Sequence, residues 1–199
     1  MIDEAVRGIR AGQPVILPTD TVYGLCTTPY TEEATIRLYA LKGRRENEPT
    51  ALLAADVDML LECVPELRGR AATIARALLP GPFTLVLPNP ARRYRWLTGG
   101  TPDKIGVRVA DLPGPAATVL QRVGAVVATS ANLSGGADPR RLEDVPRELR
   151  EAAVAEIDAG EVPGAPSTVI DVTGPEPRVL REGAVPAAEA IERVTAVVA

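Results

Sequence analysis

Short apolar runs alternate along the chain with amphipathic stretches, and Gly, Pro or polar residues separate them. The runs predict strands, whereas hydrophobic residues spaced three and four apart predict helices. The predicted strands span residues 14–18, 22–25, 51–54, 83–87, 105–109, 125–129, 154–157, 168–172 and 178–180. The predicted helices span residues 2–11, 31–42, 68–79, 116–123, 142–152 and 186–198, with a shorter one beginning at Asp56. Because the two types alternate irregularly, we expect an α/β domain on a mixed sheet.

Two of the predicted strands indicate how deeply the sheet is buried. In residues 105–109 the apolar side chains alternate with Gly106 and Arg108, which predicts a strand with one buried face. Residues 125–129 are apolar almost throughout, which predicts a strand buried on both faces. Polar clusters follow several of the strands, at the ends where open α/β sheets bind their ligands.

The composition is that of one globular domain, and we expect residues 1–199 to form it. With 199 residues, 46% of them hydrophobic, the chain can bury a core without disulfides or a structural metal. Cys26 and Cys63 lack the spacing of metal ligands, and no apolar run reaches the ~18 residues of a membrane span. The first residues do not resemble a signal peptide, so we expect a cytoplasmic protein with no membrane partner.

The chain contains no histidine. This excludes Ser-His-Asp and Cys-His hydrolase mechanisms and metal sites built on histidine. Histidine is also the only side chain whose ordinary pKa lies near neutrality. Any chemistry must therefore rely on positioning and electrostatics, on a carboxylate with a shifted pKa, or on groups that the substrates supply.

The distribution of charge points to a small anionic ligand. The formal net charge is −4, which argues against general binding of nucleic acids. Residues 1–110 nevertheless carry 14 basic and 12 acidic side chains, whereas residues 111–199 carry 8 and 14. All but two of the 22 basic residues are Arg. The two lysines, Lys42 and Lys104, are retained either by chance or because a compact charge suits phosphate.

Two polar clusters have the residue types of an anion site. Lys42, Gly43 and Arg44 end a predicted helix, where they form either a charged helix cap or a pair of phosphate ligands around a Gly. Residues 128–136 are either a Ser/Asn-rich turn or a loop whose N–H groups bind an anion. The loop is not a Walker A motif, because no Lys follows its glycines. Three further clusters, at residues 18–24, 166–171 and 178–184, are by themselves ordinary polar strand ends.

Taken together and in this order, the clusters resemble the YrdC-like family of threonylcarbamoyl-AMP synthases. The matching segments are residues 18–25, 42–44, 80–84, 106–109, 129–135, 167–171 and 181–184. They cover nearly the whole chain, and the combination of Lys-x-Arg with Ser-x-Asn is specific to the family. The resemblance implies a single YrdC-like domain of the short bacterial form, with a twisted mixed sheet and a concave, positively charged groove.

The resemblance also implies an activity and the residues that carry it. Members make threonylcarbamoyl-AMP and pyrophosphate from ATP, accompanied by Mg²⁺, L-threonine and bicarbonate. A threonylcarbamoyl-transferase complex then modifies adenosine in tRNA, so we expect weak or no direct nucleic-acid binding. The implied catalytic residues are Lys42, Arg44, Ser130 and Asn132. The expected nucleotide ligands are these four with Lys104 and Arg181. The implied threonine ligands are Thr21, Arg108 and Ser167, and no protein side chain is assigned to a metal.

The chain departs from the family pattern near these residues. Arg45, Glu48, Thr50 and Leu53 stand where the family has Pro, Asn, Leu and His. Glu48 would repel a triphosphate unless it served the metal. Leu53 would remove a polar group from the amino-acid pocket, unless it points into the core. These departures favour one alternative, a paralogue that adenylates a different carbamate.

A second alternative is a non-enzymatic RNA-binding module. Its best feature is the Arg-Arg-Tyr-Arg-Trp run at residues 92–96, which is otherwise a loop over the groove or a solvated surface. The acidic balance and the few aromatic residues argue against this alternative.

Overall fold

The computed structural model describes residues 1–45 and 47–198. Its strands are β1 (Val15–Pro18), β2 (Tyr23–Thr27), β3 (Ala51–Ala54), β4 (Phe83–Pro88), β5 (Lys104–Val109), β6 (Ala125–Ser130), β7 (Ala155–Glu156), β8 (Thr168–Asp171) and β9 (Arg178–Arg181). They form one sheet in the order β7-β1-β2-β6-β3-β5-β4-β8-β9. The β1/β7, β3/β5 and β4/β8 pairs are parallel and the others antiparallel, so the predicted mixed sheet is confirmed.

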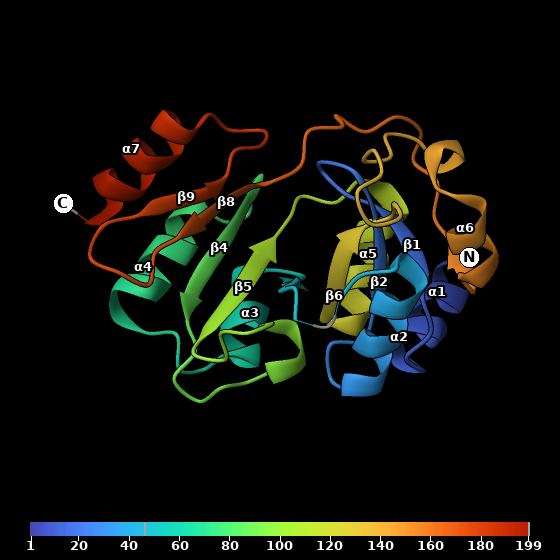
Figure 1. Ribbon diagram of the computed structural model, residues 1–199, viewed down its shortest axis with the longest axis horizontal. Coiled ribbons are helices and arrows are strands. Elements are labelled where there is room, and N and C mark those ends of the chain that lie inside the picture. The colour runs from blue at the N-terminus through green and yellow to red at the C-terminus, as the bar shows by residue number, and fades with distance from the viewer. Residues whose placement is uncertain (46, 199) are drawn as a thin grey trace.

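Helices pack on both faces of the sheet. They are α1 (Ile2–Arg10), α2 (Glu32–Lys42), α3 (Val57–Cys63), α4 (Gly69–Leu78), α5 (Gly114–Val123), α6 (Arg147–Ala152) and α7 (Ala187–Val198). One hydrophobic cluster joins one face of the sheet to α2, α3, α4, α6 and α7, and a second joins the other face to α1 and α5. Figure 1 shows α1 and the chain's N-terminus at one end of the molecule and α7 with the C-terminus at the other.

The face that carries α1 and α5 is only partly covered. These two helices contact β1, β2, β6 and β7. Among residues 1–45 and 47–198, no other helix packs in the cluster on that face, so its β4, β5 and β8 part is uncovered. On β5, Ile105 and Val107 are buried in the first cluster, whereas Gly106 and Arg108 point to the uncovered side. The predicted strand with one buried face is therefore confirmed. The uncovered strip is where a ligand site has room to form.

Two sequence predictions differ from the structure. The helix predicted over residues 142–152 is a 3₁₀ turn (Leu142–Asp144) followed by α6, because Pro146 disfavours helical backbone at the residue before it. β6 is fully buried only over its first half, since its last residues border a cavity. The helix predicted over residues 31–42 is confirmed as α2, with Thr31 at its N-cap.

Two expectations from composition concern cysteines and membranes. Cys26 and Cys63 are buried free thiols, as a reduced core predicts. Among the residues described, none of the helices combines the length and apolar character that crossing a bilayer requires.

Candidate functional site

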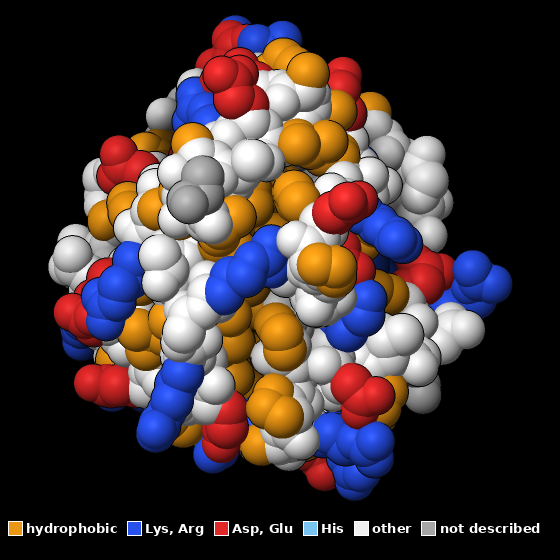
Figure 2. Space-filling model, turned by 90° about the vertical axis from the view of Figure 1, so that its left-hand side faces the viewer, with side chains coloured by type: hydrophobic (Ala, Val, Ile, Leu, Met, Phe, Trp, Pro, Cys, Tyr) orange, Lys and Arg blue, Asp and Glu red, His pale blue; other side chains and the backbone are white. Residues whose placement is uncertain are grey.

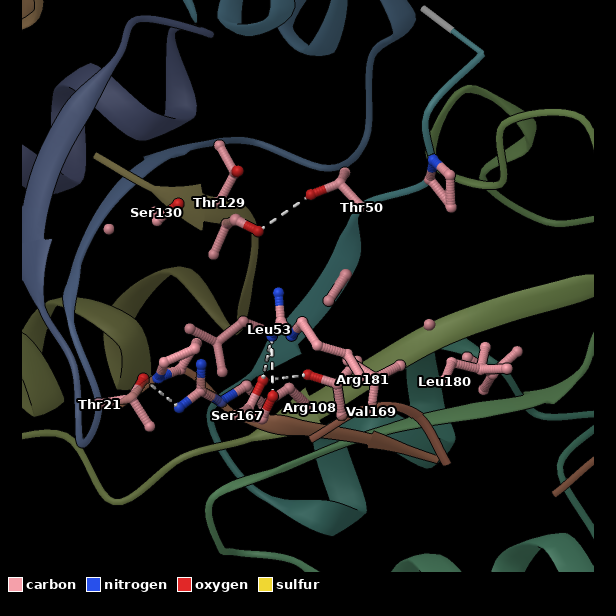
Figure 3. A pocket seen from close by; sticks show the side chains of 18 of the residues that line it. Thr21, Thr50, Leu53, Arg108, Thr129, Ser130, Ser167, Val169, Leu180 and Arg181 are labelled. Atoms are coloured by element: carbon pink, nitrogen blue, oxygen red, sulfur yellow. Dashed lines mark hydrogen bonds between the residues drawn. The ribbon is translucent and has the colours of Figure 1, made fainter. Parts of the chain in front are cut away.

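A cavity of about 540 Å³ opens on the uncovered strip of the sheet. The predicted site residues that line it are Thr21, Arg44, Lys104, Arg108, Ser130, Ser167 and Arg181. Figure 3 shows two groups of polar side chains with Leu53 between them. We call them the Ser130 end (Arg44, Thr129 and Ser130) and the Arg108 end (Thr21, Arg108, Ser167 and Arg181). Lys42 and Asn132, the remaining predicted residues, lie behind the wall of the Ser130 end.

The Ser130 end begins where α2 stops. Gly43 caps this helix in the left-handed conformation, with φ of 63°, which costs Gly little. The turn separates two basic side chains. Lys42 remains in the last helical turn and is buried, whereas Arg44 leaves the helix and lines the cavity.

Lys42 fixes the loop that follows β6. Only 4% of Lys42 is exposed. Its ammonium donates to the carbonyl oxygen of Ser130, to that of Asn132 at 2.7 Å and to Oδ1 of Asn132 at 2.9 Å. Burial, aided by repulsion from Arg44, lowers the pKa of Lys42 to about 8. All three donors of the ammonium are therefore engaged with oxygens of one loop.

Ser130 and Asn132 complete this network. The Ser130 hydroxyl donates to Oδ1 of Asn132 at 2.6 Å, and Nδ2 of Asn132 donates to the carbonyl oxygen of Gly136 at 2.6 Å. The hydroxyl proton thus points to an amide oxygen, which is no general base. The arrangement suits positioning and hydrogen bonding rather than nucleophilic attack by Ser130.

Arg44 has four contacts at the cavity wall, one of them a hydrogen bond donated to the Pro49 carbonyl. It donates to the Thr129 hydroxyl at 3.1 Å, its Cζ lies 5.4 Å from the centre of the Tyr39 ring, and its Nε lies 3.4 Å from Oε2 of Glu48. Glu48 also pairs with Arg45, whose Nε is 3.0 Å from Oε1. The carboxylate that departs from the family pattern is therefore paired with two arginines.

At the other end, Arg108 and Asp20 form an ion pair that is mostly buried. Nη2 of Arg108 donates to Oδ1 of Asp20 and, at 2.8 Å, to the Thr21 hydroxyl. Burial raises the pKa of the Asp20 carboxyl, although Arg108 opposes the rise. Nε of Arg108 is buried and has no hydrogen-bond partner within the described chain. Sequence reasoning gave Asp20 no role, although it lies in the motif at residues 18–24.

Ser167 stands just before β8 and joins two other strands. Its hydroxyl oxygen lies 2.7 Å from that of Thr84 on β4. Nη2 of Arg181 donates to the Ser167 carbonyl at 2.8 Å and to its hydroxyl at 3.3 Å. Arg181, expected among the nucleotide ligands, is therefore placed beside an expected threonine ligand.

The rim of the cavity combines an ion pair with apolar surface. Nζ of Lys104 lies 2.7 Å from Oδ2 of Asp171, so much of its charge is already matched. Val86, Val169 and Leu180 line the same side, and Leu180 is 60% exposed. Asp138 and Asp171 are the acidic residues among those lining the cavity. Within residues 1–45 and 47–198, no three Asp, Glu or Cys side chains cluster as metal ligands do.

Leu53 occupies the floor between the two ends. It is 1% exposed, lines the cavity and also packs in the hydrophobic cluster under α1 and α5. Leu53 therefore lies at the pocket and in the core at once, although the sequence analysis treated these as alternatives. Thr50, at the edge of this floor, donates its hydroxyl to the Ala128 carbonyl at 3.1 Å.

Residues 92–96 do not cover the cavity, because none of them lines it. Arg93 pairs with Glu66 at 2.7 Å, and Nε1 of Trp96 donates to the Pro29 carbonyl at 3.0 Å. On the face of the molecule shown in Figure 2, acidic, basic and hydrophobic side chains are intermixed. That face lacks the continuous positively charged surface that nucleic acids favour.

Comparison with known proteins places these residues in a family. The Sua5_yciO_yrdC family, described as "Telomere recombination", matches residues 7–183. "Threonylcarbamoyl-AMP synthase" from Pyrococcus abyssi is 35% identical over 187 residues, which are 94% of this chain and 54% of that protein. The protein of the same name from Halorhodospira halophila is 38% identical over 146 residues, 73% of this chain and 76% of its own length.

Two solved structures share the fold. Sua5 from P. abyssi complexed with L-threonine has a TM-score of 0.86 and 34% identity, over 96% of this chain and 56% of that one. YciO from Escherichia coli has a TM-score of 0.81 and 26% identity, over 93% and 90%. The chain thus spans little more than half of the P. abyssi protein and most of YciO. The RNA-module and paralogue alternatives are not favoured by these relatives.

Proposed function

The chain belongs to the Sua5/YciO/YrdC family, and on that premise we propose that it is a threonylcarbamoyl-AMP synthase. It makes threonylcarbamoyl-AMP and pyrophosphate from ATP, L-threonine and bicarbonate. The observation that carries the proposal is a single cavity in which the Ser130 end and the Arg108 end face one another. ATP and the carbamate formed from threonine, which must react with each other, need such a juxtaposition.

The nucleotide binds at the Ser130 end in this proposal. Arg44 meets the phosphates with a guanidinium already oriented by Thr129 and Tyr39. Lys42 supports that contact from behind, through Ser130 and Asn132. Lys104 at the rim is paired with Asp171, and it adds a second cation when its ammonium also contacts the phosphates. Leu180 and Val169 offer apolar surface to the base or the ribose.

Threonine binds at the Arg108 end. Its carboxylate is matched by the donors that Arg108 keeps beyond Asp20 and by the Ser167 hydroxyl, while the Thr21 hydroxyl accepts from Arg108 and so orients the guanidinium. Arg181 lies at the boundary with the phosphates, because it is bonded to Ser167 and lines the same cavity.

The reaction then needs positioning more than proton transfer. The threonine ammonium first releases a proton to solvent. The neutral amine then attacks the carbon of bicarbonate, or of the CO₂ derived from it, and forms a carbamate, while the oxygen that bicarbonate loses leaves as water. A carbamate oxygen attacks the α-phosphorus, and the bond to the leaving pyrophosphate breaks. Arg44 and Arg181 face the charge that builds on the phosphates. A chain without histidine can carry out such chemistry, since the proton released by the amine passes to solvent and the transfer at phosphorus relies on positioning and charge.

ATP enters as its Mg²⁺ complex, in which the cation screens the phosphate charge. The acidic residues lining the cavity, Asp138 and Asp171, are single carboxylates rather than a cluster, so phosphate oxygens and water supply most of the ligands. The product passes to a threonylcarbamoyl-transferase complex that acts on tRNA, and this chain itself has no need to bind the RNA.

Release of pyrophosphate from ATP tests the proposal. Purified protein is incubated with Mg-ATP and bicarbonate, with and without each of the common amino acids. Release that requires both L-threonine and bicarbonate, with threonylcarbamoyl-AMP identified by mass spectrometry, is the expected result. Release that depends on a different amino acid identifies a paralogue instead. Release without any amino acid, or none at all, contradicts the proposal.

A further inference from the structure

Two buried hydroxyls meet at the Arg108 end. Thr84 on β4 and Ser167 before β8 are 9% and 4% exposed, and their hydroxyl oxygens lie 2.7 Å apart. The parallel pairing of β4 with β8, in which Phe83 opposes Thr168, brings the two residues together. Both line the cavity, and Thr84 has no role in the reaction proposed above.

The number of protons in this pair determines what it offers a ligand. Two hydroxyls carry two protons, and a single contact between their oxygens uses one of them. Arg181 donates a further proton to the Ser167 hydroxyl oxygen. One O–H of the pair is thus left to donate to a group in the cavity, where an anionic oxygen is the fitting acceptor.

Arg181 supplies charge to the same place. Among the basic side chains that line the cavity, Arg44, Lys104 and Arg108 each have a carboxylate partner. Within the described part of the chain the Arg181 side chain forms no ion pair, and its hydrogen bonds go to Ser167. Gly183 packs closely against the Ser167 backbone, since a Cβ added at Gly183 would lie 2.7 Å from the Ser167 carbonyl oxygen.

We propose that Thr84 is a positioning residue, whose hydroxyl donates to Ser167 and so directs the Ser167 proton, beside Arg181, to the carboxylate of the amino-acid substrate. Thr84 itself need not touch the substrate. The inference rests on the proposed function for the identity of the ligand, and it deepens that function by adding an uncharged residue to the threonine site.

The test compares Thr84→Val with Thr84→Ser. Valine keeps the branched shape and removes the hydroxyl, whereas serine keeps the hydroxyl. Losing an oriented hydrogen bond should raise the KM for L-threonine about three- to ten-fold in T84V. The KM for ATP should stay within about two-fold, and T84S should restore the KM for threonine. A buried threonine at another place gives the matched control: Thr35→Val removes a hydroxyl that has no partner among the residues described and should change neither KM.

Several results would overturn the proposal. They are an unchanged KM for threonine in T84V, an equal rise in the KM for threonine and the KM for ATP, and a failure of T84S to restore the KM for threonine. If T84V does not fold, Thr84→Ala takes its place in the same comparison. Calorimetric titration of L-threonine without turnover tests the role of Thr84 separately from the proposed synthase reaction. If the unmodified protein binds threonine without making product, the proposed reaction fails, while weaker binding in T84V alone still supports the role of Thr84.

Discussion

Lys42 and Asn132 are joined twice: the ammonium of Lys42 lies 2.7 Å from the carbonyl oxygen of Asn132 and 2.9 Å from its Oδ1. With its third donor on Ser130, the ammonium has no N–H left for a phosphate unless one of these bonds opens. Under the proposed function, Lys42 acts on ATP by holding the loop in place, or by exchanging a loop oxygen for a phosphate oxygen. Either role requires the charged form.

The protonation of Lys42 predicts how ATP binding depends on pH. Its pKa of about 8 means that the ammonium loses a proton as the pH rises through that value. A neutral amine turns a lone pair toward one of three oxygens, so we expect the affinity for ATP to fall between pH 7 and pH 9. Calorimetry with Mg-ATP measures the affinity directly. Lys42→Met should bind weakly, about ten- to a hundred-fold below the unmodified protein, and equally so across this range. A flat profile in the unmodified protein contradicts the prediction.

Substitution of Glu48 is predicted to strengthen ATP binding. Its carboxylate lies 3.4 Å from Nε of Arg44 and so competes with phosphate for that guanidinium. Glu48→Asn, which restores the family residue, should strengthen ATP binding several-fold, and more so at low ionic strength because the pair is partly exposed. Arg44→Ala is the reference, since it should weaken ATP binding about ten- to a hundred-fold. Weaker binding in E48N would show that the carboxylate orients Arg44 or assists the cation.

Ser130 predicts an outcome for trapping experiments. Its hydroxyl donates to the Asn132 amide, and no histidine exists to take its proton. We therefore expect no covalent serine intermediate. Mass spectrometry of enzyme quenched during turnover should show the mass of the unmodified protein, and Ser130→Ala should lower the rate without abolishing it. An acylated or adenylated Ser130 contradicts this expectation.

Gly183 predicts a link between stability and the threonine site. A Cβ there would lie 2.1 Å from the Pro166 carbonyl oxygen, which is backbone and has little freedom to move. Gly183→Ala should therefore cost about 1–3 kcal/mol, and each kcal/mol lowers Tm by about 2–4 °C in a chain of this size. Because Pro166 precedes Ser167, threonine affinity should fall as well. Gly174→Ala is the control, since its nearest neighbour would be 3.8 Å away. Equal melting temperatures for the two variants would contradict the argument.

Local pattern was enough to predict the elements of this fold, and its failures have identifiable causes. The alternation over residues 105–109 predicts β5, because one face of that strand packs in the core and the other borders the cavity. The helix expected over 142–152 is interrupted because Pro146 imposes a local rule that outweighs the surrounding pattern.

The candidate site was predicted less completely than the fold. Motifs identified Thr21, Arg44, Arg108, Ser130, Ser167 and Arg181 because each is carried by its own short segment. Asp20 and Thr84 were missed, because their partners Arg108 and Ser167 are 88 and 83 residues away in the chain. Such pairings arise only when the sheet assembles.

Leu53 predicts how well the protein selects its amino acid. Its side chain lies between Ser130 and Arg108 on the cavity floor (Figure 3). The family resemblance implies a His at this position. An apolar surface cannot reject an analogue of similar shape as strongly as a site that must satisfy a hydrogen bond. We therefore expect threonine to be preferred over valine and serine by only about ten- to a hundred-fold.

Substitution by the family residue tests the role of Leu53. Leu53→His should sharpen the preference for threonine by adding a hydrogen-bonding group near the substrate hydroxyl. It should also lower stability, because Leu53 packs at the same time against the cluster under α1 and α5. The measurement is kcat/KM for the three amino acids, with melting temperatures recorded alongside. Leu53→Met is the matched control, since it keeps an apolar floor of similar volume and should leave the preference unchanged. Strong selectivity for threonine in the unmodified protein would show that groups at the Arg108 end read the hydroxyl without help from residue 53.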